Sequence, residues 1–119
     1  MLRRIEQGDL TLDSPVTLLA SDYVDGAGPT NRHAPGKALS VRYLLDQMLI
    51  HSDNTASDRL IRLVGIERVN AVTRELVPEG FGPITTLADV RRLIYGELHP
   101  AARTLSGKDF LALKRQLND

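Results

Sequence analysis

The stretch Ser40–Ala56, with the sequence SVRYLLDQMLIHSDNTA, decides how the chain folds. Ser40 is a good helix N-cap. After it, apolar residues recur at i, i+3, i+4, i+7 and i+8, namely at Val41, Leu44, Leu45, Met48 and Leu49. This spacing predicts an amphipathic helix with one apolar face. Small polar residues at 52–54 favour the end of one helix and the start of the next. The stretch therefore predicts two packed helices joined by a short polar turn.

Apolar periodicity continues on the C-terminal side of this turn. It predicts a second helix that ends at Gly65, a third over about 66–76, a fourth that begins near Thr86 and is closed by Gly96, and a last one after Ser106. Thr86 with Asp89, and Ser106 with Asp109, resemble capping boxes in which Asp replaces the usual Glu. The predicted fold class is all-α, with a helical cluster over residues 40–118.

The N-terminal third carries weaker signals. Residues 1–7 have the pattern of the last turns of a helix closed by Gly8, and we interpret them as the end of a truncated, longer helix. A natural short N-terminal helix is the alternative. Residues 8–39 predict an irregular connection over the surface, with short extended pieces possible around Leu10–Leu18. The expected organisation is one helical subdomain over residues 1–119.

Composition excludes several classes of function. The chain has 119 residues, with 15 basic and 15 acidic side chains, so no charge excess favours nucleic acid or an anionic membrane. It has no Cys, and no apolar run approaches the roughly 18 residues of a membrane span. The three histidines, His33, His51 and His99, offer no i, i+4 pair for zinc. We therefore expect no metal, no cofactor, no nucleic acid and no membrane span.

The turn and its surroundings resemble class A β-lactamases and related penicillin-recognising active-site-serine hydrolases. Residues 52–54 match the S-D-N motif of that family. The lead-in at 8–13, GDLTLD, resembles the segment after the family's nucleophile-bearing helix, and residues 85–98 resemble a later helix. The resemblance covers nearly the whole chain and is strongest over residues 40–56. It implies that the chain is the helical subdomain of a two-subdomain α/β fold, and that it comes from a longer, exported bacterial protein.

The resemblance also implies roles for the motif residues. Ser52 would relay a proton to the leaving β-lactam nitrogen, which suits a hydroxyl because it donates and accepts a hydrogen bond. Asn54 would bind the acyl amide of the substrate, and Asp53 would turn inward as a structural brace. Glu79 is the only carboxylate in the loop at 77–84, which is much shorter than the family's loop with the deacylating glutamate. We interpret Glu79 as a surface charge, with a role in deacylation as the alternative.

Two family motifs are missing from these 119 residues. None of the serines has Lys three residues on, so there is no S-x-x-K and no nucleophile, and there is no K-T-G. We therefore expect the chain alone to be inactive, and a longer parent to supply the missing α/β subdomain and to act on a β-lactam or related amide or ester. The alternatives are a penicillin-binding or esterase-like homologue without β-lactam turnover, and a non-catalytic helical interaction domain.

A helical subdomain without its partner should also expose an apolar patch. The helical pattern leaves several apolar residues unassigned, and these predict the patch: Leu2, Ile5, Leu18, Leu19 and Tyr23. From this patch we expect either self-association or marginal stability of the isolated chain.

Overall fold

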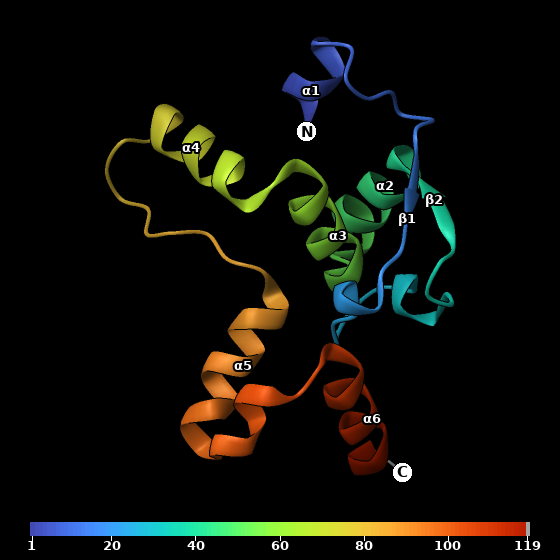
Figure 1. Cartoon of the computed structure of the whole chain (residues 1–119), viewed down its shortest axis with the longest axis vertical. Coiled ribbons are helices and arrows are strands. Elements are labelled where there is room, and N and C mark those ends of the chain that lie inside the picture. The colour runs from blue at the N-terminus through green and yellow to red at the C-terminus, as the bar shows by residue number, and fades with distance from the viewer. Residues whose placement is uncertain (119) are drawn as a thin grey trace.

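The computed structural model describes residues 1–118, and they form a mostly helical molecule, as the fold class predicts (Figure 1). Six α-helices follow one another along the chain: α1 (Leu2–Glu6), α2 (Val41–His51), α3 (Asn54–Val64), α4 (Ile66–Leu76), α5 (Leu87–Leu98) and α6 (Gly107–Asn118). Three short 3₁₀ helices that the sequence does not predict lie in the connections: η1 (Ala20–Asp22), η2 (Thr30–Arg32) and η3 (Pro100–Thr104).

The connection before α2 contains a small antiparallel sheet. Strand β1 (Pro15–Thr17) pairs with β2 (Ala38–Ser40), with Val16 opposite Leu39. The predicted surface connection is therefore partly wrong, because this segment returns to the core. Leu18 and Tyr23, which we expected in an exposed patch, are almost fully buried. Leu18 lies between exposed neighbours, whereas Tyr23 lies in a short run of buried residues at 22–25, and neither pattern is long enough to predict a helix or a strand.

The core lies where β1, β2 and the loop after β1 cover α2 and α3 (Figure 1). Val41 and Leu44, from the predicted apolar stripe of α2, are fully buried, and Leu45 and Met48 pack partly against them. Leu49 is the exception, since it projects into solvent at the end of the stripe. All buried members of the core cluster lie in residues 1–64, which we call the body: Val16, Leu18, Tyr23, Leu39, Val41, Leu44, Ala56 and Leu60.

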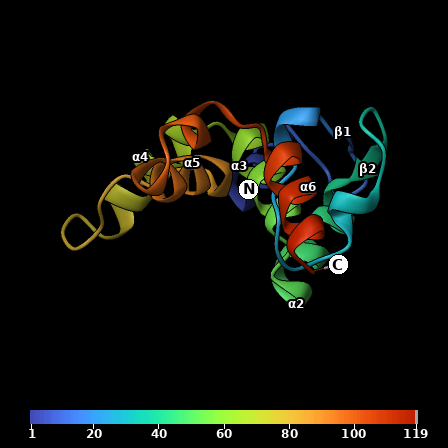
Figure 2. The ribbon, with the colours of Figure 1, turned by 90° about the horizontal axis from the view of Figure 1, so that it is seen from below.

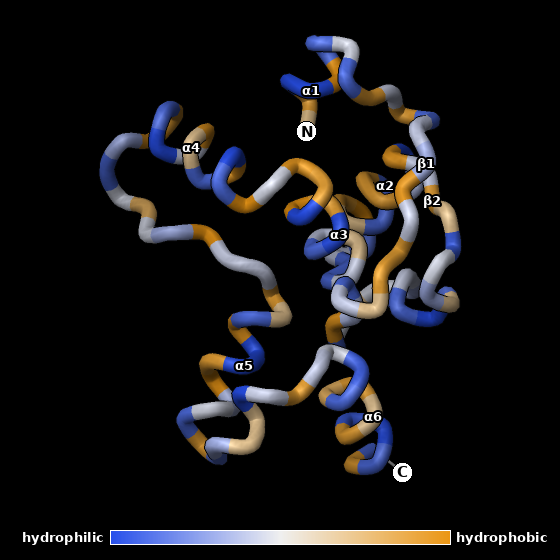
Figure 3. Tube along the Cα trace, in the orientation of Figure 1, coloured by the Kyte–Doolittle hydropathy of each residue, from blue (hydrophilic) through white to orange (hydrophobic). Residues whose placement is uncertain are grey.

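The helices α4, α5 and α6, which we call the C-terminal helices, extend outward from the body (Figures 1 and 2). The radius of gyration is 15.2 Å, whereas a compact domain of this length has a value of roughly 13–14 Å. Figure 3 shows apolar residues along α5 and α6, and several of them are exposed. No helix within residues 1–118 is long and apolar enough to cross a membrane.

The prediction that Gly96 closes the fourth helix is wrong, because α5 continues to Leu98. Gly96 instead lies where a side chain from η3 packs closely against the helix. A Cβ atom built there would lie 2.6 Å from Cγ of Arg103, whose side chain crosses the helix at this point. The glycine permits the close approach of η3 to α5 and does not end the helix.

Candidate functional site

The turn at residues 52–54 is built by an abrupt reversal between α2 and α3. Ser52 has φ of 51° and ψ of 38°, and it is the only non-glycine residue with positive φ within residues 1–118. The backbone N–H groups of Ser52 and Asp53 both donate to the carbonyl oxygen of Gln47, which closes α2. A serine in this left-handed region is strained. The result is a tight turn that leaves the Ser52 side chain exposed.

Asp53 turns in the opposite direction and is completely buried. Its Oδ1 accepts a hydrogen bond from the backbone N–H of Ala56 at 2.9 Å, which caps α3. Its Oδ2 accepts from the backbone N–H of Thr30 at 2.8 Å. Both carboxylate oxygens therefore have backbone donors, as a buried carboxylate requires, and the inward orientation expected from the sequence is present.

Asn54 and Thr55 hold the loop that faces the turn. The Nδ2 of Asn54 donates to the carbonyl oxygen of Asp25 at 2.8 Å, and its backbone N–H donates to Ala27 at 3.3 Å. Thr55 Oγ1 donates to the carbonyl oxygen of Val24 and accepts from its N–H group. Asp53, Asn54 and Thr55, three successive residues, thus fix the loop at 24–30 by hydrogen bonds.

Glycines permit this close approach. A Cβ at Gly26 would lie 2.3 Å from Asn54 Nδ2, and one at Gly28 would lie 2.1 Å from Asp53 Oδ2. Both glycines also have positive φ, of 121° and 94°. The close packing of these glycines against residues 53 and 54 depends on the folded chain, so no local sequence pattern predicts it.

Two buried acidic residues that the sequence did not single out connect the site to the C-terminal helices. Asp58 on α3 accepts from the backbone N–H groups of Leu87 and Ala88 at 2.7 and 2.9 Å, which caps α5. Burial raises the pKa of Asp58, although these two hydrogen bonds act in the opposite direction. The Asp25 carboxylate accepts from Nε of Arg91 at 2.8 Å. The only sequence signal for Asp58 is its place one turn after Asn54.

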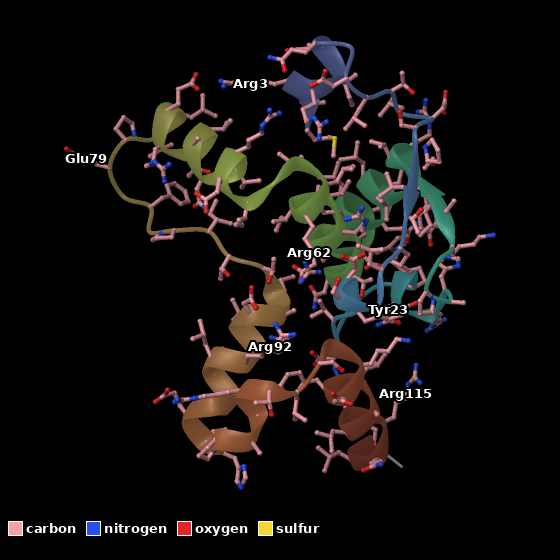
Figure 4. All side chains as sticks on the ribbon, viewed as in Figure 1. Arg3, Tyr23, Arg62, Glu79, Arg92 and Arg115 are labelled. Carbon is pink, nitrogen blue, oxygen red and sulfur yellow. The ribbon has the colours of Figure 1, made fainter. Side chains whose placement is uncertain are left out.

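The other predicted residues lie elsewhere. Glu79 is exposed at the outer edge of the loop between α4 and α5, and it points away from α2 and α3 (Figure 4). His33 Nε2 lies 3.0 Å from the hydroxyl of Tyr43, His99 caps η3, and His51 is exposed. Within residues 1–118, no three His, Cys, Asp or Glu side chains gather as a metal site would require.

Comparison with solved structures places this fold among known proteins. The chain is similar to a beta-lactamase from Sphaerobacter thermophilus, with 29% identity, a TM-score of 0.60, and coverage of 71% of this chain and 33% of that chain. It shares its fold with PBP-A, with 24% identity, a TM-score of 0.61, and coverage of 85% of this chain and 44% of that chain. A PBP-A variant solved as an acyl-enzyme complex with penicillin G has the same identity and TM-score, and the match covers 85% of this chain and 45% of that one.

The chain thus spans less than half the length of each of these structures. No curated protein matches it. A family model described as the beta-lactamase enzyme family matches residues 1–117, which is nearly the whole chain. The chain therefore belongs to the beta-lactamase enzyme family.

Proposed function

We propose that the chain is the helical subdomain of a class A β-lactamase-like serine hydrolase, and that it contributes the turn at residues 52–54 to acyl transfer from a β-lactam or a related amide or ester. The observation that carries the proposal is the form of the turn. Ser52 is exposed in a strained, left-handed conformation, and the next residue, Asp53, is fully buried. Strained backbone of this kind is common at functional sites.

Ser52 acts as the proton relay in this proposal. Opening a β-lactam ring requires a proton on the departing nitrogen, and a hydroxyl can accept one proton while it donates another. The exposed side chain of Ser52 can reach a substrate without rearrangement of α2 or α3. Asp53 holds the turn through its two backbone hydrogen bonds and takes no part in the chemistry.

Asn54 acts as the substrate-binding residue. One of its amide N–H groups is committed to the carbonyl oxygen of Asp25, which fixes the plane of the side chain. A side-chain amide has a second N–H and a carbonyl oxygen, and these complement an amide of the substrate. Because Asn54 is only half-buried, such a substrate can approach it.

The nucleophile is proposed to lie outside residues 1–119, because no serine in the sequence is followed by Lys three residues later. Acyl transfer needs an activated nucleophile. The proposal therefore concerns a longer protein, in which a second subdomain supplies the Ser–Lys pair and the K-T-G segment.

Kinetics of that longer protein test the proposal. Ser52→Ala should lower the rate of acylation by benzylpenicillin at least about a hundredfold, which is the usual contribution of a proton-transfer group. Ser21→Ala is the matched control, because Ser21 is an exposed serine that lies in η1 and not in the turn. The control should acylate at the rate of the unmodified protein. Equal rates for the two variants would exclude Ser52 as the relay.

A second candidate function is acylation without turnover. The position of Glu79 favours it, because this carboxylate is exposed and points away from α2 and α3 (Figure 4). In that case, the penicilloyl adduct of the longer protein should persist for hours, and Glu79→Gln should leave its lifetime unchanged. A short-lived adduct whose lifetime increases in Glu79→Gln would assign deacylation to Glu79 and reject this second candidate.

A further inference from the structure

We propose that Arg91 on α5 is a positioning residue for Asn54, and that it acts through Asp25. The inference rests on the proposed function, in which Asn54 binds the substrate amide. It adds that a residue of the C-terminal helices, 37 positions along the chain, controls the orientation of that amide.

The first step is the ion pair between Arg91 and Asp25. Nε of Arg91 lies 2.8 Å from Oδ1 of Asp25, and the two side chains are 26% and 9% exposed. A charge-assisted hydrogen bond that is largely shielded from water is stronger than a surface pair. Lys114 Nζ lies farther from the other carboxylate oxygen, at 3.8 Å, with half of its side chain exposed. Arg91 is therefore the main partner of Asp25.

The backbone of Asp25 in turn contacts the side chain of Asn54. The carbonyl oxygen of Asp25 accepts the 2.8 Å hydrogen bond from Asn54 Nδ2. The next residue, Gly26, passes so close that the position of its absent Cβ is 2.3 Å from Asn54 Nδ2 and 3.9 Å from Nη2 of Arg91. The Arg91 guanidinium and the Asn54 amide thus flank the same piece of backbone.

The consequence is a coupled set of three residues. If Arg91 is removed, the buried Asp25 carboxylate loses its main counter-charge and must move toward water or toward Lys114. Thr55 holds Val24, and the backbone N–H of Asn54 donates to Ala27, so the movement is taken up at Asp25 and at Gly26, whose missing side chain permits it. The carbonyl oxygen of Asp25 then shifts, and the Asn54 amide loses the hydrogen bond that fixes its plane.

The positioning itself can be tested on the 119-residue chain without a substrate. In a ¹⁵N-labelled sample, Arg91→Ala and Asp25→Asn should both shift the side-chain amide signals of Asn54 and speed their exchange with solvent. Arg103→Ala is the control, because it removes an exposed arginine that pairs with Glu97, and it should leave those signals in place. Unchanged Asn54 signals in Arg91→Ala, with the fold intact by circular dichroism, would overturn the proposal.

The catalytic consequence is tested in the longer protein with two substrates. Benzylpenicillin carries an acyl amide, whereas 6-aminopenicillanic acid lacks it. Arg91→Ala should lower the acylation efficiency with benzylpenicillin by roughly tenfold, with little change for 6-aminopenicillanic acid, and Arg91→Lys should restore part of the loss. An equal loss with both substrates would indicate a general structural role and overturn the inference.

Failure of the proposed function would look different. An unmodified longer protein that acylates with neither substrate would reject the β-lactam assignment. The amide signals of Asn54 would still decide whether Arg91 positions that side chain.

Discussion

The body and the C-terminal helices of this chain are stabilised in different ways. In the body, β1, β2 and the loop after β1 enclose α2 and α3, and Val41 and Leu44 have no exposed surface. In the C-terminal helices, large apolar side chains remain in solvent, with Leu98 80% and Leu117 86% exposed. The turn at residues 52–54 therefore belongs to the part of the chain that encloses its own apolar core.

Two buried acidic residues connect α5 and α6 to the body. Asp58 caps α5, and Asp25 pairs with Arg91 and Lys114. Between α5, η3 and α6 remains a cavity of about 520 Å³ lined mainly by apolar residues: Tyr95, Leu98, Ala102, Leu105, Phe110, Leu113 and Leu117. We expect this surface, and not the predicted one around Leu18 and Tyr23, to be the site of any self-association or of contact with the proposed second subdomain.

Truncation of a core residue should give the largest effect. Leu44→Ala removes a fully buried side chain from the body and should lower the free energy of unfolding by about 2–5 kcal/mol. Leu98→Ala, in α5, should change it by less than about 0.5 kcal/mol, because that side chain is already mostly in water. Urea denaturation of both variants measures the difference. Similar losses would mean that the C-terminal helices share the core.

The brace below the turn should give the next largest effect. Asp53→Ala removes the acceptors of Thr30 and Ala56 and leaves two backbone N–H groups in the interior without partners. Each orphaned buried group costs about 1–3 kcal/mol, so the two together should lower the free energy of unfolding by at least about 2 kcal/mol, measured by thermal or urea denaturation. A loss below about 0.5 kcal/mol would show that water replaces the carboxylate and that Asp53 is not a brace.

The buried carboxyl group of Asp58, which connects α3 to the start of α5, should make the stability of the chain depend on pH. Burial raises the folded-state pKa of Asp58 above its unfolded value of about 3.9. Between these two values the folded chain binds more protons than the unfolded chain, so the contribution of Asp58 to stability is complete below about pH 3.9 and falls as the pH rises. Denaturation of the unmodified chain and of Asp58→Asn from pH 3 to 7 measures this. The difference in their stability should decrease with rising pH, and an increase would contradict the assigned shift.

The smallest effect should come from the strained serine itself. Ser52→Gly places at φ of 51° a residue that adopts this conformation without strain. The free energy of unfolding should stay the same or rise by up to about 1 kcal/mol, although the variant removes the proposed proton relay. A marked loss of stability would instead show that the hydroxyl has a structural role.

Strong periodicity explains what the sequence could predict. The boundaries of α2, α3 and α4 follow from apolar spacing and from caps at Ser40, Asp53 and Gly65. The inward orientation of Asp53 follows from the cost of burying a carboxylate without partners. These are local features, so one chain segment is sufficient to reveal them.

Other features depend on contacts between distant segments. The pairing of β1 with β2, the contact of Arg103 with Gly96 and the pairing of Asp25 with Arg91 join residues that no local pattern relates. The burial of Leu18 and Tyr23 was missed for the same reason. The turn between α2 and α3 could therefore be predicted from the sequence, whereas the residues that hold it in place required the structure.

We propose that residues 52–54 form part of an active site whose nucleophile lies outside residues 1–119. The most direct test is to incubate both the 119-residue chain and the longer protein with benzylpenicillin and to map the acylated peptide by mass spectrometry. We expect no adduct on the 119-residue chain and one penicilloyl group in the longer protein, on a serine outside residues 1–119. A stoichiometric adduct on any of the six serines of this chain, or no adduct on the longer protein, would contradict it.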